Sequence, residues 1–298
     1  MIPDFLINEL KKEYGDELAS KIISGYSKKR PTTFRVNTIK ATEQEIGQEL
    51  EKNKVTFKKY EYIPNAYIIE DEQFDIEQTD IYKDGKIYLQ SISSMLPPII
   101  LEPLADNDIL DMAAAPGGKT TQIAALTNNQ ANITACEMNN IRVQRLKYNI
   151  EKQGATSVYV MQEDSRKIND FFSFDQILLD APCSGSGTLN FKNQDLEKTF
   201  TTKLIQKSIK AQTSLLEKAI KILKSGNEMV YSTCSILQEE NEDRINEILK
   251  KSHCEIVPIE FEGMEELPIL PTKINGTLCV CPNEYYEGFF VAKIRKIK

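Results

Sequence analysis

Hydrophobic residues follow helical spacing at the start of this 298-residue chain and strand spacing soon afterwards. Over residues 1–25 they recur every three or four positions, which predicts an amphipathic helix; they are Phe5, Leu6, Leu10, Leu18, Ile22 and Ile23. Pro31 ends this helix, and residues 34–36 follow as a short strand. Thr42 and Glu45 match a capping box, which predicts a second helix reaching about Lys52.

Apolar positions near residues 55–60 and 67–69 predict further strands, so residues 1–84 form a small α+β domain with an acidic connection at 71–84. Its basic residues Lys28, Lys29, Arg30 and Arg35 are interpreted either as phosphate contacts or as surface charge. Residues 85–90 predict a strand and residues 91–101 a helix bent at two prolines. They lead into a larger domain, residues 85–298.

From residue 108 onwards, predicted strands alternate with predicted helices. The strands lie at 109–112, 132–137, 158–161, 174–180, 228–232, 255–257 and 288–294, and the helices at about 119–126, after 137, and at 203–223 and 238–250. The strand at 174–180 is almost continuously apolar, as expected for a parallel strand buried on both faces. This alternation predicts an α/β domain with a doubly wound sheet.

Small residues follow the first of these strands, where a helix is predicted to begin. The stretch is Ala113, Ala114, Ala115, Pro116, Gly117, Gly118 and Lys119. Glycine tolerates positive φ, and the start of a helix offers free N–H groups to a ligand. The glycine spacing matches neither the phosphate loop of NTPases nor Gly-x-Gly-x-x-Gly. The stretch is therefore interpreted as a nucleotide-like ligand site, with an ordinary strand-to-helix turn as the alternative.

Composition excludes several classes of protein. A hydrophobic content of 41% supports a real core, and no apolar run approaches the roughly 20 residues of a membrane span. We see no signal peptide and expect a cytoplasmic protein without membrane contact. The six cysteines form no Cys-x-x-Cys pair, and His253 is the only histidine, so we expect neither a metal site nor a histidine-dependent hydrolase.

Charge is distributed unevenly along the chain. A net charge of −7 argues against nonspecific nucleic-acid binding. Residues 191–224, however, carry eight lysines against three acidic residues. Such a stretch suits a polyanionic substrate, and a solvated helix face is the alternative interpretation.

Polar residues stand at the ends of four predicted strands: Glu137, Asp164, Asp180 and Cys234. The carboxyl ends of parallel strands are where ligands bind in an open α/β sheet. Glu137 lies about twenty residues after the glycines, where an acid suits ribose hydroxyls. A helix N-cap is the alternative interpretation for each single acid.

Three motifs carry a resemblance to a known family. They are Asp111-Met-Ala-Ala-Ala-Pro-Gly-Gly-Lys-Thr120, Asp180-Ala-Pro-Cys-Ser-Gly-Ser-Gly187 and Ser232-Thr-Cys-Ser-Ile-Leu-Gln-Glu-Glu-Asn241. Together with residues 30–38, 88–94 and 288–293, they resemble the RNA cytosine-carbon-5 methyltransferases of the Nop2/Sun group over nearly the whole chain. The resemblance implies a Rossmann-like class I methyltransferase sheet.

The resemblance also implies S-adenosylmethionine as cofactor and an RNA cytosine, single-stranded or flipped, as substrate. It assigns catalysis to Cys234 as nucleophile, Cys183 as a later assistant, Asp180 at ring nitrogen 3, and Lys119. It assigns cofactor binding to Ala113, Ala114, Ala115, Pro116, Gly117, Gly118, Lys119, Glu137, Arg142, Asp164 and Asp180. We favour ribosomal RNA over transfer RNA, and a monomer.

Two rival interpretations stay open at this point. A DNA cytosine methyltransferase would use Cys183 as the nucleophile, and an RNA-binding ribosome-assembly factor would not methylate at all. Residues 281–287 also depart from the family by lacking a proline-histidine pair, which puts local substrate contacts in doubt. Since the chain ends soon after residue 294, we expect RNA selection to come from the N-terminal domain, the lysine stretch or a partner.

Overall fold

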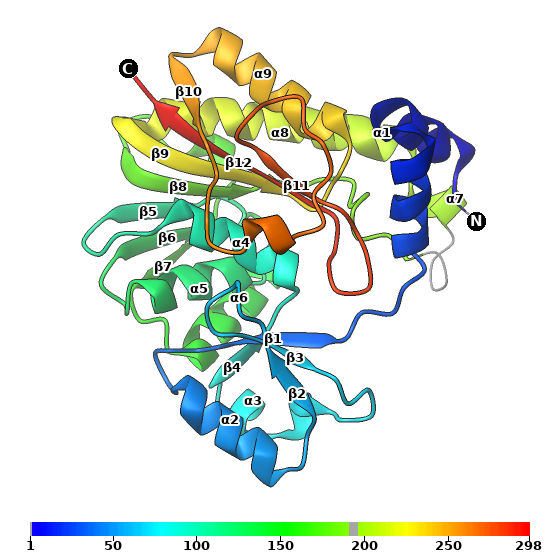
Figure 1. Cartoon of the computed structure of the whole chain (residues 1–298). Helices are drawn as coiled ribbons and strands as arrows, with labels where there is room; N and C mark the ends of the chain where they lie inside the picture. Colours follow the sequence, from blue (N-terminus) through cyan, green and yellow to red (C-terminus); the bar gives the residue numbers. More distant parts are fainter. Residues whose placement is uncertain (1, 191–195) are drawn as a thin grey trace. The chain divides into compact units, whose positions relative to one another are not determined.

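The computed structural model describes residues 2–190 and 196–298 of the chain (Figure 1). Its residues divide into two compact units. Unit 1 comprises the described residues of 1–30, 179–221 and 225–298, and unit 2 comprises residues 31–178 and 222–224. The predicted residues Lys192 and Asp195 of the lysine stretch lie outside the described part.

Unit 2 begins with a small antiparallel sheet of order β2-β3-β1-β4. Its strands are β1 (Thr32–Val36), β2 (Phe57–Lys59), β3 (Ala66–Ile69) and β4 (Ile87–Leu89). Phe34 pairs with Tyr67 across β1 and β3, and their stacked rings lie in the core of this sheet. Helix α2 (Glu43–Lys52) starts with the predicted capping box, in which the Thr42 and Glu45 side chains each accept from the other residue's backbone N–H.

The segment predicted as a plain connection, residues 71–84, contains a 3-10 turn (Ile76–Gln78) and helix α3 (Asp80–Lys83). The side chains of Asp75 and Thr79 cap these two short elements. Elements of three and four residues are too short to show a hydrophobic period, so the prediction missed them.

The parallel strands of unit 2 are β5 (Asp108–Asp111), β6 (Asn132–Cys136), β7 (Val158–Met161) and β8 (Phe174–Asp180), with β8 continuing into unit 1. Ile109 of β5 pairs with Ile133 of β6 and with Gln176 of β8. The helices are α4 (Ile92–Leu101), α5 (Gly118–Leu126) and α6 (Asn140–Gln153). The mixed α/β sheet has the order β10-β12-β9-β8-β5-β6-β7, which confirms the predicted fold class.

Unit 1 contributes β9 (Leu223–Thr233, from residue 225), β10 (Cys254–Val257), β11 (Leu278–Val280) and β12 (Phe289–Lys296). β12 runs antiparallel to β9, β10 and β11. The helices are α1 (Asp4–Gly25), kinked at Gly15, α7 (Leu196–Thr199), α8 (Thr202–Ile222) and α9 (Glu242–Lys251).

One predicted helix, residues 238–250, is wrong in its first turn. Residues Gln238–Glu240 form a separate 3-10 turn, and α9 begins only at Glu242. Asn241, with φ −118° and ψ −96°, is not helical and separates the 3-10 turn from α9. Its side chain is held instead by the end of β9, where its Oδ1 accepts from the Thr233 hydroxyl at 2.6 Å.

Candidate active site

The glycine turn of unit 2 lies between β5 and α5. Gly117 caps α5 with φ +112°, a conformation that side chains rarely adopt, and Gly118 is the first helical residue. A Cβ added at Gly118 would lie 3.0 Å from the ring of Tyr88, and one at Gly117 would lie 3.0 Å from Leu146. The two glycines therefore let Leu146 and Tyr88 pack directly against the backbone of the turn.

The turn is held by hydrogen bonds to its carbonyl groups. Arg142 donates to the Ala115 carbonyl at 2.6 Å, and Asn149 donates to the Pro116 carbonyl at 2.8 Å. Asp111, buried at the end of β5, accepts from the Thr120 hydroxyl at 2.6 Å. Two of these bonds hold the carbonyl groups of the turn, and the third ties the first turn of α5 to the end of β5.

Two acids follow the neighbouring parallel strands of unit 2. Glu137, only 5% exposed, comes directly after β6; its carboxylate accepts from the Asn139 N–H at 2.8 Å and lies 3.1 Å from Arg142. Asp164, after β7, caps the 3-10 turn Ser165–Lys167 and pairs with Arg166 at 2.6 Å, and hydrogen bonding to Arg166 lowers its pKa. The alternative interpretation of an N-cap therefore applies to Asp164.

Arg35 of β1 lies against the glycine turn, contrary to its interpretation as a phosphate contact or a surface charge. It is 3% exposed, stacks on Tyr88, and donates to the Gly118 carbonyl at 3.0 Å and to the Thr121 hydroxyl at 2.7 Å. Burial lowers its pKa to about 10. The only sequence signal was its position inside a strand, where alternate side chains point inward.

Lys119, the last residue of the small-residue stretch, lies in the first turn of α5. Its ammonium group donates to the Ser94 hydroxyl of α4 at 2.9 Å. Its assignment to catalysis with Asp180, Cys183 and Cys234 stays a prediction, since those three residues belong to unit 1.

Unit 1 brings Cys183, Cys234 and Asp180 together. The Cys183 and Cys234 sulfur atoms lie 3.0 Å apart, and both thiols are free and half-buried. The Ala181 N–H donates to the Ser232 carbonyl at 2.8 Å, and the Ser232 hydroxyl donates to Asp180 at 2.8 Å. These two bonds align the ends of β8 and β9, from which the two thiol-bearing loops leave.

The Cys183 thiol has a pKa raised well above its ordinary value. The main cause is its hydrogen bond with Cys234, followed by burial and by electrostatic interaction with Cys234 and Glu240. Cys183 is therefore a neutral thiol near pH 7. As a neutral thiol it can donate its S–H to the sulfur of Cys234.

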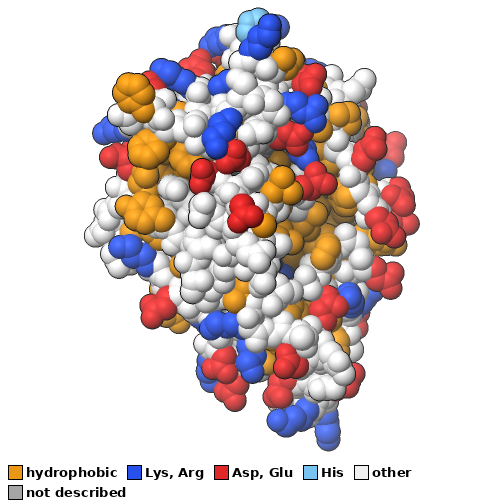
Figure 2. All heavy atoms as spheres, turned by 90° about the vertical axis from the view of Figure 1, so that its left-hand side faces the viewer, with side chains coloured by type: hydrophobic (Ala, Val, Ile, Leu, Met, Phe, Trp, Pro, Cys, Tyr) orange, Lys and Arg blue, Asp and Glu red, His pale blue; other side chains and the backbone are white. Residues whose placement is uncertain are grey.

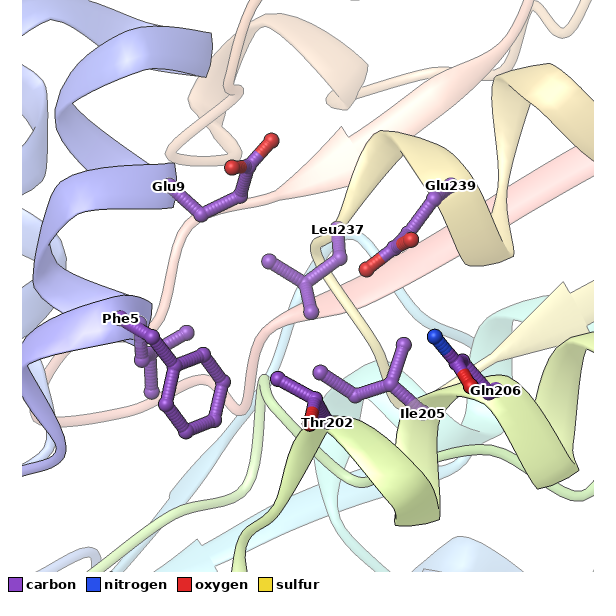
Figure 3. A pocket seen from close by; sticks show the side chains of 8 residues that line it. Phe5, Glu9, Thr202, Ile205, Gln206, Leu237 and Glu239 are labelled. Atoms are coloured by element: carbon purple, nitrogen blue, oxygen red, sulfur yellow. The ribbon is translucent and has the colours of Figure 1, made fainter.

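Helix α1 contacts the loop that follows Cys234. The Tyr14 hydroxyl donates to the Ile236 carbonyl, and the Glu13 carboxylate accepts from the Gln238 N–H at 3.2 Å. Beside these contacts lies a cavity of about 220 Å³ lined by residues of α1, of α8 and of the segment 237–239. Phe5, Ile205 and Leu237 project toward one another there (Figure 3). None of the predicted site residues lines this cavity.

The remaining cysteines have structural surroundings. Cys136 is fully buried and donates to the Glu163 carbonyl at 3.1 Å, so it packs as a small buried residue. Cys254 is half-buried on strand β10. In the part of the chain that the structure describes, no group of three His, Cys, Asp or Glu residues is placed to hold a metal ion.

Charged side chains of both signs are interspersed around hydrophobic patches on the face drawn in Figure 2. Of the predicted lysine stretch, Lys203, Lys207 and Lys210 are exposed on α8. Lys224 instead pairs with Asp175 at 2.8 Å within unit 2. Among residues 2–190 and 196–298, no helix has the length and apolarity needed to cross a membrane.

Two family models match the chain. The model described as 16S rRNA methyltransferase RsmB/F matches residues 98–295, and the RsmF/B-like ferredoxin-like domain matches residues 2–77. The chain belongs to the RsmB/F family. This membership confirms the resemblance to the Nop2/Sun group that the three motifs carried.

Individual relatives match nearly the whole length of this chain. Ribosomal RNA small subunit methyltransferase F from Shewanella piezotolerans is 35% identical over 98% of this chain, and the protein of that name from Shewanella loihica is also 35% identical. The chain spans 63% and 62% of their lengths. A solved methyltransferase homolog from Pyrococcus horikoshii is 34% identical, with a TM-score of 0.86 over 99% of this chain and 95% of that one.

The cofactor of RsmB/F methyltransferases is S-adenosylmethionine. NSun6 from Pyrococcus horikoshii, which shares this fold at a TM-score of 0.88 and 24% identity over 100% of this chain and 99% of that one, was solved with SFG. The residues of unit 2 fit such a donor. Helix α5 starts directly after the carboxyl end of the parallel strand β5, where ligands bind in such sheets, and the buried Glu137 carboxylate after β6 can accept from ribose hydroxyls.

Proposed function

We propose that this chain is an S-adenosylmethionine-dependent methyltransferase acting on carbon 5 of a cytosine in ribosomal RNA. The observation that carries the proposal is the pair of free thiols, 3.0 Å apart, that follows the ends of β8 and β9. A plain methyl transfer to a nucleophilic nitrogen or oxygen needs no thiol. Carbon 5 of cytosine is a poor nucleophile and does need one.

In the proposed mechanism the Cys234 sulfur adds to carbon 6 of the ring. The ring electrons then move toward carbon 5, which becomes nucleophilic. Asp180, held by Ser232, faces ring nitrogen 3 and favours its protonated form, which makes carbon 6 more electrophilic. The bound donor supplies the methyl group.

Cys183 acts at the release step. When the proton of carbon 5 leaves, the carbon 6–sulfur bond breaks and Cys234 departs as a thiolate. A neutral Cys183, whose pKa is raised by its hydrogen bond to Cys234, donates its S–H to that departing sulfur, and the Cys183 thiolate so formed accepts the proton that leaves carbon 5. This explains why two cysteines are paired and gives them different roles.

Donor binding is assigned to the larger domain, residues 85–298, and RNA contacts to residues 1–84 and the exposed lysines of α8. Ala113 to Lys119 would hold the amino-acid part of the donor, and Glu137 its ribose. Arg142, through the Ala115 carbonyl, and Asp164, through the turn Ser165–Lys167, would position the backbone around the donor. The substrate cytosine must be single-stranded or flipped, and we propose that a monomer in the cytoplasm acts on it.

The experiment combines methylation of small-subunit ribosomal RNA with trapping of the protein–RNA adduct. Cys234→Ala should abolish both methylation, mapped by bisulfite sequencing, and the adduct. Cys183→Ala should accumulate a denaturation-resistant adduct, because addition still occurs and release fails. Cys254→Ala, a half-buried cysteine of the same unit, is the matched control and should behave like the wild type.

The same experiment separates the rival functions. An adduct that survives Cys234→Ala and disappears in Cys183→Ala would reverse the two roles, as in a DNA cytosine methyltransferase. Methylation of transfer RNA alone would overturn the choice of ribosomal RNA. Absence of donor binding by calorimetry would instead favour an assembly factor.

A further inference from the structure

Glu240 is a fully buried carboxylate in unit 1 that none of the assigned roles uses. It ends the 3-10 turn Gln238–Glu240, six residues after Cys234. A buried carboxylate costs free energy unless donors satisfy it, so its contacts need an explanation.

Both oxygens of this carboxylate are occupied by hydrogen bonds. One accepts from the Ser184 N–H at 2.8 Å and from the Gln212 amide of α8 at 3.1 Å. The other accepts from the Ser184 hydroxyl at 2.5 Å and from the Ser235 hydroxyl at 2.6 Å. Four donors on two oxygens fill the capacity of a carboxylate, and they come from three separate segments.

Two of the donor residues stand next to the thiols in the sequence. Ser184 directly follows Cys183, and Ser235 directly follows Cys234. A single carboxylate thus fixes the residue after each cysteine. The backbone of Glu240 is held as well, because its carbonyl accepts from the buried Tyr231 hydroxyl at 2.6 Å.

We propose that Glu240 is a positioning residue that sets the distance between Cys183 and Cys234 by clamping the loops after β8 and β9. It touches neither substrate nor donor. The inference rests on the proposed function for its catalytic meaning, whereas the clamp itself is a property of the free protein. The shape and acceptors of the side chain carry this role, since all four contacts are hydrogen bonds from neutral groups.

The test compares Glu240→Ala with Glu240→Gln. The amide keeps an oxygen for the Ser184 N–H and Gln212, and its NH₂ can donate to the two serine hydroxyls, which accept as readily as they donate. Alanine removes every contact. Glu239→Ala, one residue earlier and lining the cavity of Figure 3, is the matched control.

The primary measurement is the rate of disulfide formation between Cys183 and Cys234 in the RNA-free protein, followed by peptide mass spectrometry. Diamide is the oxidant: it takes up the two electrons and two protons that the two thiols release. We expect Glu240→Ala to slow this reaction at least tenfold, while Glu240→Gln and Glu239→Ala stay within about threefold of the wild type. An unchanged rate in Glu240→Ala, or an equal loss in Glu240→Gln, overturns the proposal.

Two further readouts keep the inference separate from the proposed function. Thiol pairing needs neither RNA nor donor, so it tests the clamp even if the chain methylates another substrate. In the methylation assay, Glu240→Ala should lower kcat with little change in KM, and Glu240→Gln should restore it. If Glu240→Ala fails to fold, Ser184→Ala and Ser235→Ala replace it, and each should slow thiol pairing; normal pairing in both overturns the clamp.

Discussion

The glycine turn of unit 2 and the thiol loops of unit 1 both depend on glycine, but for different reasons. At Gly117 and Gly118 an added Cβ would meet side chains, those of Leu146 and Tyr88. At Gly187 it would lie 2.1 Å from the backbone oxygen of Gly288. Side chains can move aside and a hydrogen-bonded backbone cannot, so the thiol loops are the less adaptable of the two regions.

The two regions also differ in how fully their buried ionisable side chains, Glu240 and Arg35, are hydrogen-bonded. The Glu240 carboxylate receives four hydrogen bonds within the thiol loops. Arg35, beside the glycine turn, uses its Nε and Nη2, while its Nη1 has no hydrogen-bond partner among the described residues. The Glu240 carboxylate therefore has its hydrogen-bonding capacity filled, whereas the Arg35 guanidinium does not. Among the described residues, each region still holds one buried polar atom without a partner, since Gln212 Oε1 beside Glu240 also has none.

The largest effect is expected for Gly187→Ala. The Gly187 N–H donates to the Cys234 carbonyl and its own carbonyl accepts from Gly288, so a methyl group there must separate two bonded backbones. We expect a loss of about 3 kcal/mol in the free energy of unfolding, measured by urea titration. Gly47→Ala in α2, where nothing lies within 4 Å, is the control and should be neutral or stabilising. Equal effects at the two glycines would remove the contrast between the regions.

Arg35→Met comes next. It deletes the donors to Gly118, Thr121 and Gln90, so donor affinity should fall about tenfold and unfolding should become easier by about 2 kcal/mol. Asn37→Ala is the matched control, because Asn37 directly follows β1 and donates to the Gly85 and Gln153 carbonyls instead of the glycine turn. It should lower stability and leave donor affinity, measured by calorimetry, unchanged. Equal losses of affinity would mean that Arg35 has no specific effect on the glycine turn.

Sequence predicted the regular elements well and the contacts between distant segments poorly. The apolar run at 174–180 and the small residues at 113–118 placed β8 and the glycine turn because each pattern has a local cause. The inward direction of Arg35 and the role of Glu240 depend on partners far along the chain, such as Thr121 and Ser184. No local spacing encodes such partners, so both residues were identified only in the folded chain.

Gly118→Ala tests whether the glycine turn adapts. Its Cβ would meet the edge of the Tyr88 ring at 3.0 Å, and the ring can shift. We expect a loss of about 1 kcal/mol in stability and a severalfold weaker donor affinity. Gly118→Ala should therefore weaken donor affinity less in a Tyr88→Leu background than in the wild type. An equal loss of affinity in both backgrounds would mean that the backbone of the turn, and not the Tyr88 ring, excludes a side chain at position 118.

Unit 1 should also show a pH dependence of its stability through Glu13 of α1. Burial, together with the nearby carboxylates Glu9, Glu242 and Glu239, raises its pKa to about 8 despite its bond from the Gln238 N–H. In the unfolded chain this acid loses its proton near pH 4.5, whereas the folded protein keeps it until about pH 8. The folded state therefore binds more protons between these values, and stability falls as pH rises from about 5 to 8.

Glu13→Gln should remove this fall, which for one proton amounts to at most about 1.4 kcal/mol per pH unit between the two pKa values. The measurement is the difference in urea-unfolding free energy between variant and wild type from pH 5 to 9, which cancels the titration of all other groups. The variant should gain relative stability steadily up to pH 8 and no more beyond it. Glu17→Gln, an exposed residue of the same helix paired with Lys21, should give a flat difference over this range. A flat difference for Glu13→Gln as well would show that the Glu13 carboxylate is already ionised in the folded protein, and that the contact between α1 and the loop after Cys234 does not depend on its proton.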